Sequence, residues 1–169
     1  LMDGEFAPSK SPSVDEIWWP ASALADLHIM YKNPDKYLDK IIKMQPNLVI
    51  IHAESPIHHM HFAAELHKEN IKAGLAVLAD THIKACEEIL HSFDHVLIFS
   101  GNLGYQGGSE VDASLLEKVK FVRSNHPEAE IGWDGGVNDT NAKMLAKAGV
   151  NVLNVGGFIQ KAQNPEAAF

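Results

Sequence analysis

The chain has 169 residues, 46% of them hydrophobic, so it is long enough to bury a sizeable core. Its 14 Lys and Arg against 22 Asp and Glu give a formal net charge of -8, and the lysines are spread along the chain, which argues against a nucleic-acid partner. No segment is continuously apolar over the roughly 20 residues that a membrane span requires, and nothing resembles a signal peptide. The single cysteine, Cys86, excludes an internal disulfide and fits a reducing, cytoplasmic location.

Segments typical of strands and helices alternate along the chain. Residues 1–4 are typical of the end of a strand, and further strands are predicted at residues 25–30, 47–52, 72–77, 95–100, 130–134 and 150–155. Between them, helices are predicted to start at Asn33-Pro34 and to cover about residues 58–70, 80–92, 114–124 and 140–148, with Asp80-Thr81 as a cap. One more helix begins at Asn164-Pro165.

This alternation indicates parallel strands joined by right-handed crossovers. Two α/β architectures fit the pattern: an open doubly wound sheet and a (β/α) barrel. A barrel of this kind has about 200 to 250 residues. Because the sequence enters inside an element and ends as a helix begins, we expect a TIM (β/α)8 barrel recorded without its first strand-helix unit, most of its second strand and its last helix.

The candidate site is organised around Asp134. This residue ends an apolar strand and precedes Gly135 and Gly136, so a ligand can approach the backbone beside its carboxylate. The alternative is that Asp134 only caps the following turn and that the glycines supply its backbone angles. Polar residues at the ends of other predicted strands favour a shared site at the carboxyl ends of the sheet. They are His28, His52 with Glu54, and Ser100 with Asn102.

Two glycine-rich loops also follow predicted strands, at residues 104–108 and at Gly156-Gly157. In barrels, the loop after the last strands commonly binds phosphate through backbone N–H groups. Each loop alone is a weak signal, but on either side of Asp134 the two favour a small phosphorylated ligand. His28 with Asp134 would suit zinc or a similar divalent ion.

Three histidines, His58, His59 and His61, lie in one predicted helix. His58 and His61 share a face of that helix, which raises the alternative of a second metal site. No acid or cysteine completes a tight ligand set beside them, so the pattern does not favour metal binding there.

Several motifs, in matching order and spacing, resemble those of the ribulose-phosphate 3-epimerase family over essentially all 169 residues. The matching segments are Met2-Asp3-Gly4-Glu5-Phe6-Ala7-Pro8, His28-Ile29-Met30, Ile51-His52-Ala53-Glu54, Asn102-Leu103-Gly104-Tyr105-Gln106-Gly107, Asp134-Gly135-Gly136-Val137-Asn138 and Gly156-Gly157. The resemblance implies one ribulose-phosphate-binding TIM-barrel domain over residues 1–169. It also implies an isomerase that interconverts D-ribulose 5-phosphate and D-xylulose 5-phosphate by metal-assisted proton transfer at C3, through an enediolate.

The resemblance assigns roles to individual residues. Asp134 would be a catalytic acid or base and, with His28, a ligand of a divalent metal, for which zinc is the first expectation and iron, manganese and cobalt are alternatives. Met2 and Met30 would shield the enediolate. The phosphorylated ketose would contact these four residues and the glycine-rich segments, namely Gly104, Tyr105, Gln106, Gly107, Gly135, Gly136, Gly156 and Gly157.

Departures from the family pattern bear on these expectations. Family members carry His-x-Asp before Met-Asp-Gly, which supplies two further metal ligands and the second acid or base, and this sequence begins just after it. Asp3 is not expected to substitute, because strand alternation places it on the opposite face from Met2. We therefore expect the 169 residues alone to have negligible epimerase activity.

Inside the matched region, Leu103 replaces a loop proline, Gln106 shifts a glycine pair, Gly157 replaces a serine and Phe99 replaces a third shielding methionine. These changes keep open a hexulose phosphate, allulose 6-phosphate, as the alternative substrate. They also keep open a phosphate-binding barrel without catalysis. Exposed apolar barrel faces lead us to expect a homo-oligomer.

Overall fold

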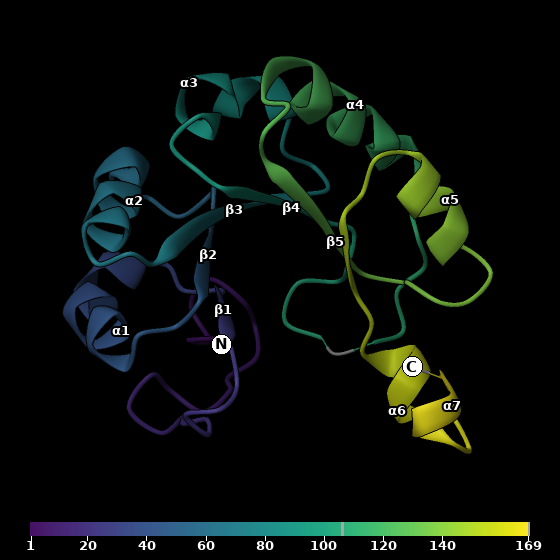
Figure 1. Cartoon of the computed structure of the whole chain (residues 1–169), viewed down its shortest axis with the longest axis horizontal. Coiled ribbons are helices and arrows are strands. Elements are labelled where there is room, and N and C mark those ends of the chain that lie inside the picture. The colour runs from purple at the N-terminus through teal and green to yellow at the C-terminus, as the bar shows by residue number, and fades with distance from the viewer. Residues whose placement is uncertain (106, 169) are drawn as a thin grey trace.

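The computed structural model describes residues 1–105 and 107–168, and one curled parallel sheet forms its centre (Figure 1). The strands pair in chain order, without a reversal. They are β1 (Asp26–Ile29), β2 (Leu48–His52), β3 (Lys72–Leu78), β4 (His95–Phe99), β5 (Glu130–Asp134) and β6 (Val152–Asn154).

Helices connect the strands and lie on the convex side of the sheet (Figure 1). They are the 3-10 turn η1 (Pro34–Tyr37) with α1 (Leu38–Met44), α2 (His59–Lys68), η2 (Ile83–Cys86) with α3 (Glu87–Leu90), η3 (Ala113–Leu115) with α4 (Leu116–Asn125), and α5 (Ala142–Lys147). After β6 come α6 (Gly157–Gln160) and α7 (Pro165–Ala168). No helix in residues 1–105 or 107–168 has the length and apolar character to cross a membrane.

The sequential strand order and the helices on one side confirm the barrel prediction and exclude the doubly wound alternative, whose strand order reverses and whose helices cover both faces. The six described strands form a curled half-barrel. Met2 extends the sheet beside β1 through an isolated parallel bridge to Met30, where the Met30 N–H donates to the Leu1 carbonyl at 2.7 Å. The first residues thus pair beside β1 as predicted, but through one bridge and without forming a strand of their own.

Strand alternation gives the sheet two buried faces. The side chains that face the helices belong to the main core, which includes Ile51, Val77, Ile98 and Trp133. On the concave side, a smaller cluster is formed by Leu48, Ile50, Ala76 and Leu97. Because both faces are covered, β2 and β4 are unbroken apolar runs in the sequence.

Some helix starts differ from the sequence predictions. Asp80-Thr81 does not cap the helix after β3; instead the His82 side chain accepts a hydrogen bond from the Lys84 N–H at 3.4 Å, and the helical turns start at Ile83. Helix α6 was not predicted, because its glycines favour a loop on local grounds. The predicted start at Asn164-Pro165 is confirmed by α7.

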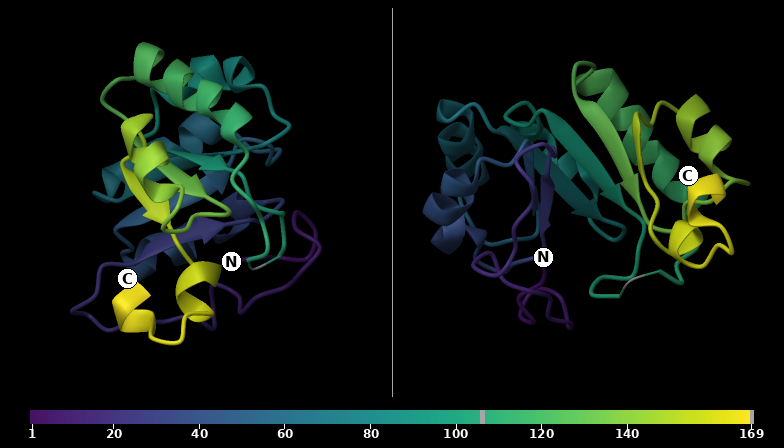
Figure 2. Two further views of the ribbon diagram at one scale, coloured as in Figure 1. Left: turned by 90° about the vertical axis from the view of Figure 1, so that its right-hand side faces the viewer. Right: turned by 60° about the horizontal axis from the view of Figure 1, so that its bottom comes forward.

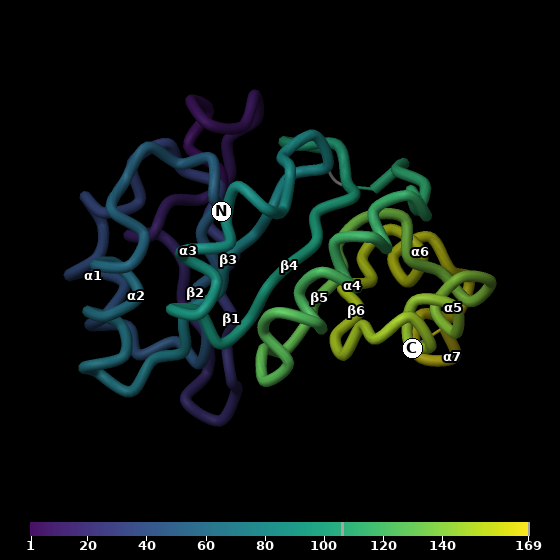
Figure 3. The backbone as a smooth tube through the Cα atoms, turned by 90° about the horizontal axis from the view of Figure 1, so that it is seen from above, coloured from purple at the N-terminus to yellow at the C-terminus, as the bar shows by residue number. Residues whose placement is uncertain are grey.

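The carboxyl ends of the strands face the cleft described below. There the N-terminal segment, the loop after β4 and α6 lie at the same end of the sheet (Figure 2, right). The backbone tube also places the N-terminal segment and the loop after β4 together at one end (Figure 3).

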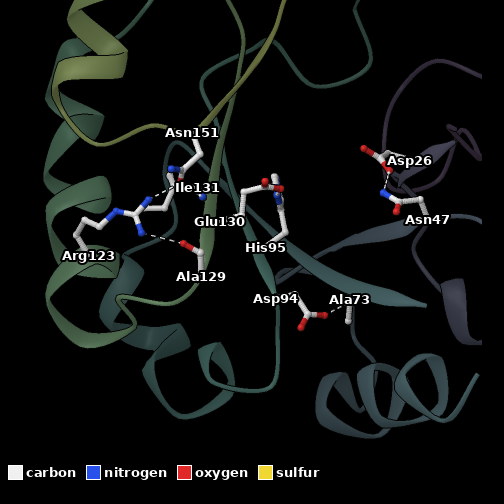
Figure 4. A network of polar contacts seen from close by, with 10 residues as sticks. All are labelled: Asp26, Asn47, Ala73, Asp94, His95, Arg123, Ala129, Glu130, Ile131 and Asn151. Carbon is white, nitrogen blue, oxygen red and sulfur yellow. Dashed lines mark hydrogen bonds and ion pairs between the residues drawn. The ribbon is translucent and has the colours of Figure 1, made fainter. Parts of the chain in front are cut away.

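The amino ends of the strands are held by a network of polar contacts (Figure 4). The Asn47 amide donates to Asp26 at 2.7 Å, and the Asp94 carboxylate accepts from the Ala73 N–H at 2.9 Å. Arg123 of α4 has the most partners: its guanidinium donates to three backbone carbonyls, those of Pro127, Ala129 and Gly149, each at 2.9 Å, and to the Asn151 side chain. It thereby ties α4 to the segments that enter β5 and β6.

Replacing Arg123 by alanine is expected to lower the free energy of unfolding by about 2 to 4 kcal/mol, because several carbonyls lose a charged donor at once. Urea denaturation measures the change. Lys120→Ala, on an exposed position of the same helix, is the matched control. Equal midpoints for the two variants would show that the guanidinium contacts do not stabilise the fold.

Candidate functional site

A cleft of about 930 Å³ opens at the carboxyl ends of the strands. Its size lies within the range of small-molecule sites. The predicted site residues that the structure describes all line this cleft: Met2, His28, Met30, Gly104, Tyr105, Gly107, Asp134, Gly135, Gly136, Gly156 and Gly157. Gln106 lies outside the described residues. The cleft therefore gathers predicted site residues that are up to 155 positions apart in the sequence, from Met2 to Gly157.

His28 of β1 and Asp134 of β5 face each other in the cleft. The distance between His28 Nδ1 and Asp134 Oδ2 is 3.7 Å, and their side chains are 17% and 31% exposed. This distance is too long for a direct hydrogen bond. Two ligands that each lie about 2.1 Å from one zinc ion are roughly 3.4 Å apart at a tetrahedral angle. The pair therefore fits two neighbouring ligands of one divalent ion, with an imidazole and a carboxylate as donors.

Burial lowers the pKa of His28 from its ordinary value of 6.5 to about 4, and the nearby Asp134 carboxylate only partly opposes this shift. Phe99 approaches the ring edge-on, with the centroids 5.8 Å apart, and adds to the apolar surroundings. At neutral pH the His28 ring is therefore uncharged, which is the form that ligates a metal.

The lowered pKa of His28 predicts a pH-dependent stability for the metal-free protein. Above pH 6.5 the ring is neutral whether the chain is folded or unfolded, and its contribution to stability is fully present. Between pH 6.5 and 4 the unfolded chain takes up a proton that the folded one does not, so the free energy of unfolding falls, by at most roughly 3 kcal/mol. Urea denaturation of wild type and His28→Gln at pH 7 and pH 5 measures this. Equal pH dependence in the two proteins would contradict it.

The turn after β5 is fixed by side chains around its glycines. The Trp133 indole donates to the Gly135 carbonyl at 3.0 Å, and the Asn141 amide donates to the Gly136 carbonyl at 2.9 Å. Gly136 has a φ of +75°, and a Cβ there would lie 2.4 Å from the backbone of Glu110. The turn and the loop after β4 thus pack backbone against backbone, which places Asp134 at the cleft wall.

The two glycine-rich loops predicted to hold phosphate lie side by side. A Cβ built on Gly157 would lie 3.3 Å from the Cα of Gly107. Tyr105, which belongs to the first of these loops and also lines the cleft, is 69% exposed. The loops thus form one continuous stretch of the cleft lining, in which backbone rather than side chains would meet a ligand.

Asp3 lies outside the cleft lining, as strand alternation predicted. Its carboxylate accepts hydrogen bonds from the backbone N–H groups of Glu5, Phe6 and Lys32, at 2.7 to 2.8 Å. Partial burial opposes its ionisation, but these hydrogen bonds outweigh burial and lower its pKa. Asp3 therefore serves the N-terminal loop and is not available as an acid or base.

The histidine side chains at the start of α2 point to different partners and do not converge on one site. His58 caps the helix, accepting from the His61 N–H at 3.3 Å, while His61 faces Glu65 at 3.6 Å. His59 turns the other way and contacts the His52 carbonyl at 3.0 Å. Within residues 1–105 and 107–168, no group of three or more His, Cys, Asp or Glu is placed to hold a metal ion, at α2 or in the cleft.

Some residues near the cleft had no role in the sequence predictions. Ser11, Glu110, Asn154 and Lys161 also line it. Asn154 could have been found, because it lies near the end of the strand predicted at residues 150–155, whereas Ser11 and Lys161 carry no local signal. His52 and Glu54 stood out at a strand end without an assigned role, and His52 lies directly behind His28, with Nε2 atoms 2.8 Å apart.

Comparisons with known proteins agree with this arrangement. The ribulose-phosphate 3 epimerase family model matches residues 1–160. The chain is 34% identical over 174 residues to a ribulose-phosphate 3-epimerase of Aquifex aeolicus, covering 99% of this chain and 78% of that protein. It is 32% identical over 168 residues to a ribulose-phosphate 3-epimerase of Bacillus subtilis, covering 94% and 76%.

Solved structures resemble the fold at lower identity. KGPDC from Streptococcus mutans superposes with a TM-score of 0.67 at 12% identity, covering 87% of this chain and 68% of that one. A 3-hexulose-6-phosphate synthase gives 0.62 at 20% identity, covering 79% and 64%. These structures support the barrel architecture alone. The family match along residues 1–160 and the curated relatives at 30% identity or more go further, and by them this chain belongs to the ribulose-phosphate 3-epimerase family.

Proposed function

We propose that this chain forms the active-site wall of an isomerase that interconverts D-ribulose 5-phosphate and D-xylulose 5-phosphate. The observation that carries the proposal is the pairing of His28 with Asp134, 3.7 Å apart, in a cleft that also holds two touching glycine loops. A carboxylate beside a neutral imidazole can exchange a proton and hold a cation. Successive backbone N–H groups in glycine loops suit a phosphate.

Asp134 is the proposed acid or base at C3 of the sugar. A hydrogen beside a carbonyl is weakly acidic, and its removal moves negative charge onto the carbonyl oxygen. A divalent ion held by His28 and Asp134 would stabilise that charge when bound. Zinc suits these donors, with iron, manganese and cobalt as alternatives. The family's His-x-Asp segment would supply two further ligands and the opposing acid or base, a role that Asp3 cannot take.

Met2, Met30 and Phe99 form the proposed apolar wall of the reaction site. All three line the cleft, and Phe99 is 4% exposed. Apolar side chains beside the reacting carbon keep water from protonating an enediolate at random. Phe99 stands where the family has a methionine, and its rigid ring narrows the space beside His28.

The far part of the cleft is the proposed phosphate subsite. Gly104, Tyr105, Gly107, Gly156 and Gly157 line it, and Lys161 adds a positive charge to the same lining. Gly135 and Gly136, which directly follow Asp134 in the chain, also line the cleft.

The substrate preference is tested by comparing kcat/KM for ribulose 5-phosphate and allulose 6-phosphate. The assay uses the full-length product of the gene. The expected result is a clear preference for the pentulose phosphate. A preference for the hexulose phosphate would reassign the substrate but keep the chemistry. Binding of both sugars without turnover would favour a phosphate-binding barrel that has lost catalysis.

A further inference from the structure

A line of polar side chains runs from the cleft into the protein interior. It starts with Asp134 and His28, continues across the 2.8 Å contact between His28 Nε2 and His52 Nε2, and ends where His52 Nδ1 faces Glu54 Oε2 at 3.5 Å. These residues come from β5, from β1 and from the end of β2. Only the first two face the cleft lining, so His52 and Glu54 are not explained by contact with a substrate.

His52 is held in place on several sides. Its side chain is fully buried, and its ring stacks on that of His28 with centroids 4.9 Å apart. Phe6 and Phe99 pack against it at 4.8 and 5.7 Å. A buried imidazole with so little freedom can present its two nitrogens in only one direction each, toward His28 and toward Glu54.

Two buried atoms at the inner end of the line lack a hydrogen-bond partner among the described residues, and they are His52 Nδ1 and Glu54 Oε2. They face each other at 3.5 Å. Leaving buried polar atoms unpaired is costly, so each is the natural partner of the other once a proton stands between them.

The direction of the protons follows from the inner end of the line. The Glu54 carboxylate can only accept, so His52 carries its hydrogen on Nδ1 and presents a lone pair on Nε2. His28 Nε2 must then donate across the 2.8 Å contact, which leaves the lone pair of His28 on Nδ1, facing the cleft where a cation would bind. Each donor along the line thus has one acceptor, and all the hydrogen bonds point from His28 toward Glu54.

We propose that Glu54 and His52 are positioning residues that fix the tautomer and orientation of His28 and strengthen it as a metal ligand; this rests on the proposed role of His28 in the function above. Partners that accept the second N–H of a metal-binding histidine hold its ring and raise its basicity. Here the carboxylate acts through an additional imidazole, which places the negative charge one ring further from the substrate.

Glu54 is built to remain an anion in this position. Burial opposes its ionisation, but the facing His52 imidazole and hydrogen bonds from Thr81 and the Leu78 N–H outweigh burial and lower its pKa. The segment that carries the Leu78 N–H is itself anchored, because the Lys118 ammonium donates to the carbonyls of Leu78 and Ala79 at 2.5 and 2.8 Å.

¹⁵N NMR tests the proposal, because it shows directly which nitrogen of each histidine carries the hydrogen. The sample is the full-length product of the gene, freed of metal. The expected spectrum has hydrogen on Nε2 of His28 and on Nδ1 of His52. Hydrogen on Nε2 of His52 would overturn the proposal without any variant being made, so the outcome does not depend on a mutant folding.

A variant then tests the effect on the metal. Glu54→Gln keeps the shape of the side chain and removes its charge, and zinc affinity, measured by competition with a chelator, is expected to fall about 10- to 100-fold. Glu65→Gln is the matched control, because Glu65 faces His61 at a similar 3.6 Å but on the surface. Equal zinc affinity in the two variants would overturn the proposal. If the NMR signal of wild-type His28 did not change when zinc is added, the metal site of the proposed function would be refuted. The tautomers of the metal-free protein would still decide whether His52 and Glu54 orient His28.

Discussion

Replacing Asp134 by asparagine is expected to lower epimerase turnover by roughly 10³-fold or more, because the variant loses an acid or base and a charged metal ligand together. The amide keeps the shape of the side chain, and the glycine loops are untouched, so binding of a phosphorylated sugar should persist. Exchange of the C3 proton, followed by NMR, and ligand binding, followed by calorimetry, separate the two effects.

Asp139→Asn is the matched control, since Asp139 is an exposed carboxylate five positions further along that does not line the cleft. It should exchange the proton at the wild-type rate. Retained exchange in Asp134→Asn would remove Asp134 from the mechanism, and loss of sugar binding as well would mean that its carboxylate serves the structure of the cleft.

Replacing Gly136 by alanine is the second change with a large expected effect. The residue has a φ of +75°, which costs an alanine about 1 to 2 kcal/mol, and the added methyl group would lie 2.4 Å from the backbone of Glu110 and of Val111. Because backbone atoms cannot move aside as a flexible side chain can, we expect the loop after β4 to be displaced and turnover to be nearly lost. Thermal unfolding and turnover are measured together.

Gly108→Ala isolates the steric part of that effect. Gly108 has a φ of +79°, so its backbone strain is similar, but a Cβ there would meet nothing within 4 Å. The Gly136 variant should therefore unfold at a clearly lower temperature than the Gly108 variant. Equal melting temperatures would mean that the contact with Glu110 is relieved at no cost.

The strands of this fold could be predicted because a strand that is buried on both faces has an uninterrupted run of apolar residues. The runs at residues 47–52 and 95–100 are apolar without alternation, and both are buried central strands. Short helices were located less well. At residues 80–92, Asp80 and Thr81 have the local chemistry of a cap, yet the chain stays in a turn for longer and His82 takes the role. The local sequence allowed the helix to start after Asp80-Thr81 or after His82, and tertiary packing selected the second.

The sequence was sufficient to predict which residues line the candidate site, but not which of their side chains contact residues behind the cleft. Strand ends and glycine loops identified His28, Asp134 and Gly157, because parallel strands bring their carboxyl ends to one edge. The line of side chains from His28 through His52 to Glu54 could not be predicted, since it depends on the orientation of the His52 ring and on a contact between neighbouring strands. Likewise, the contacts of Arg123 join segments whose proximity exists only after the sheet has curled.

The most direct test of the proposed chemistry is deuterium incorporation at C3 of ribulose 5-phosphate in deuterated buffer. The polypeptide as its gene encodes it is first freed of metal and then supplied with zinc. We predict incorporation that requires the metal and that disappears in Asp134→Asn. Absence of deuterium at C3 in the zinc-supplied protein, while the sugar phosphate is bound, would contradict the epimerase account.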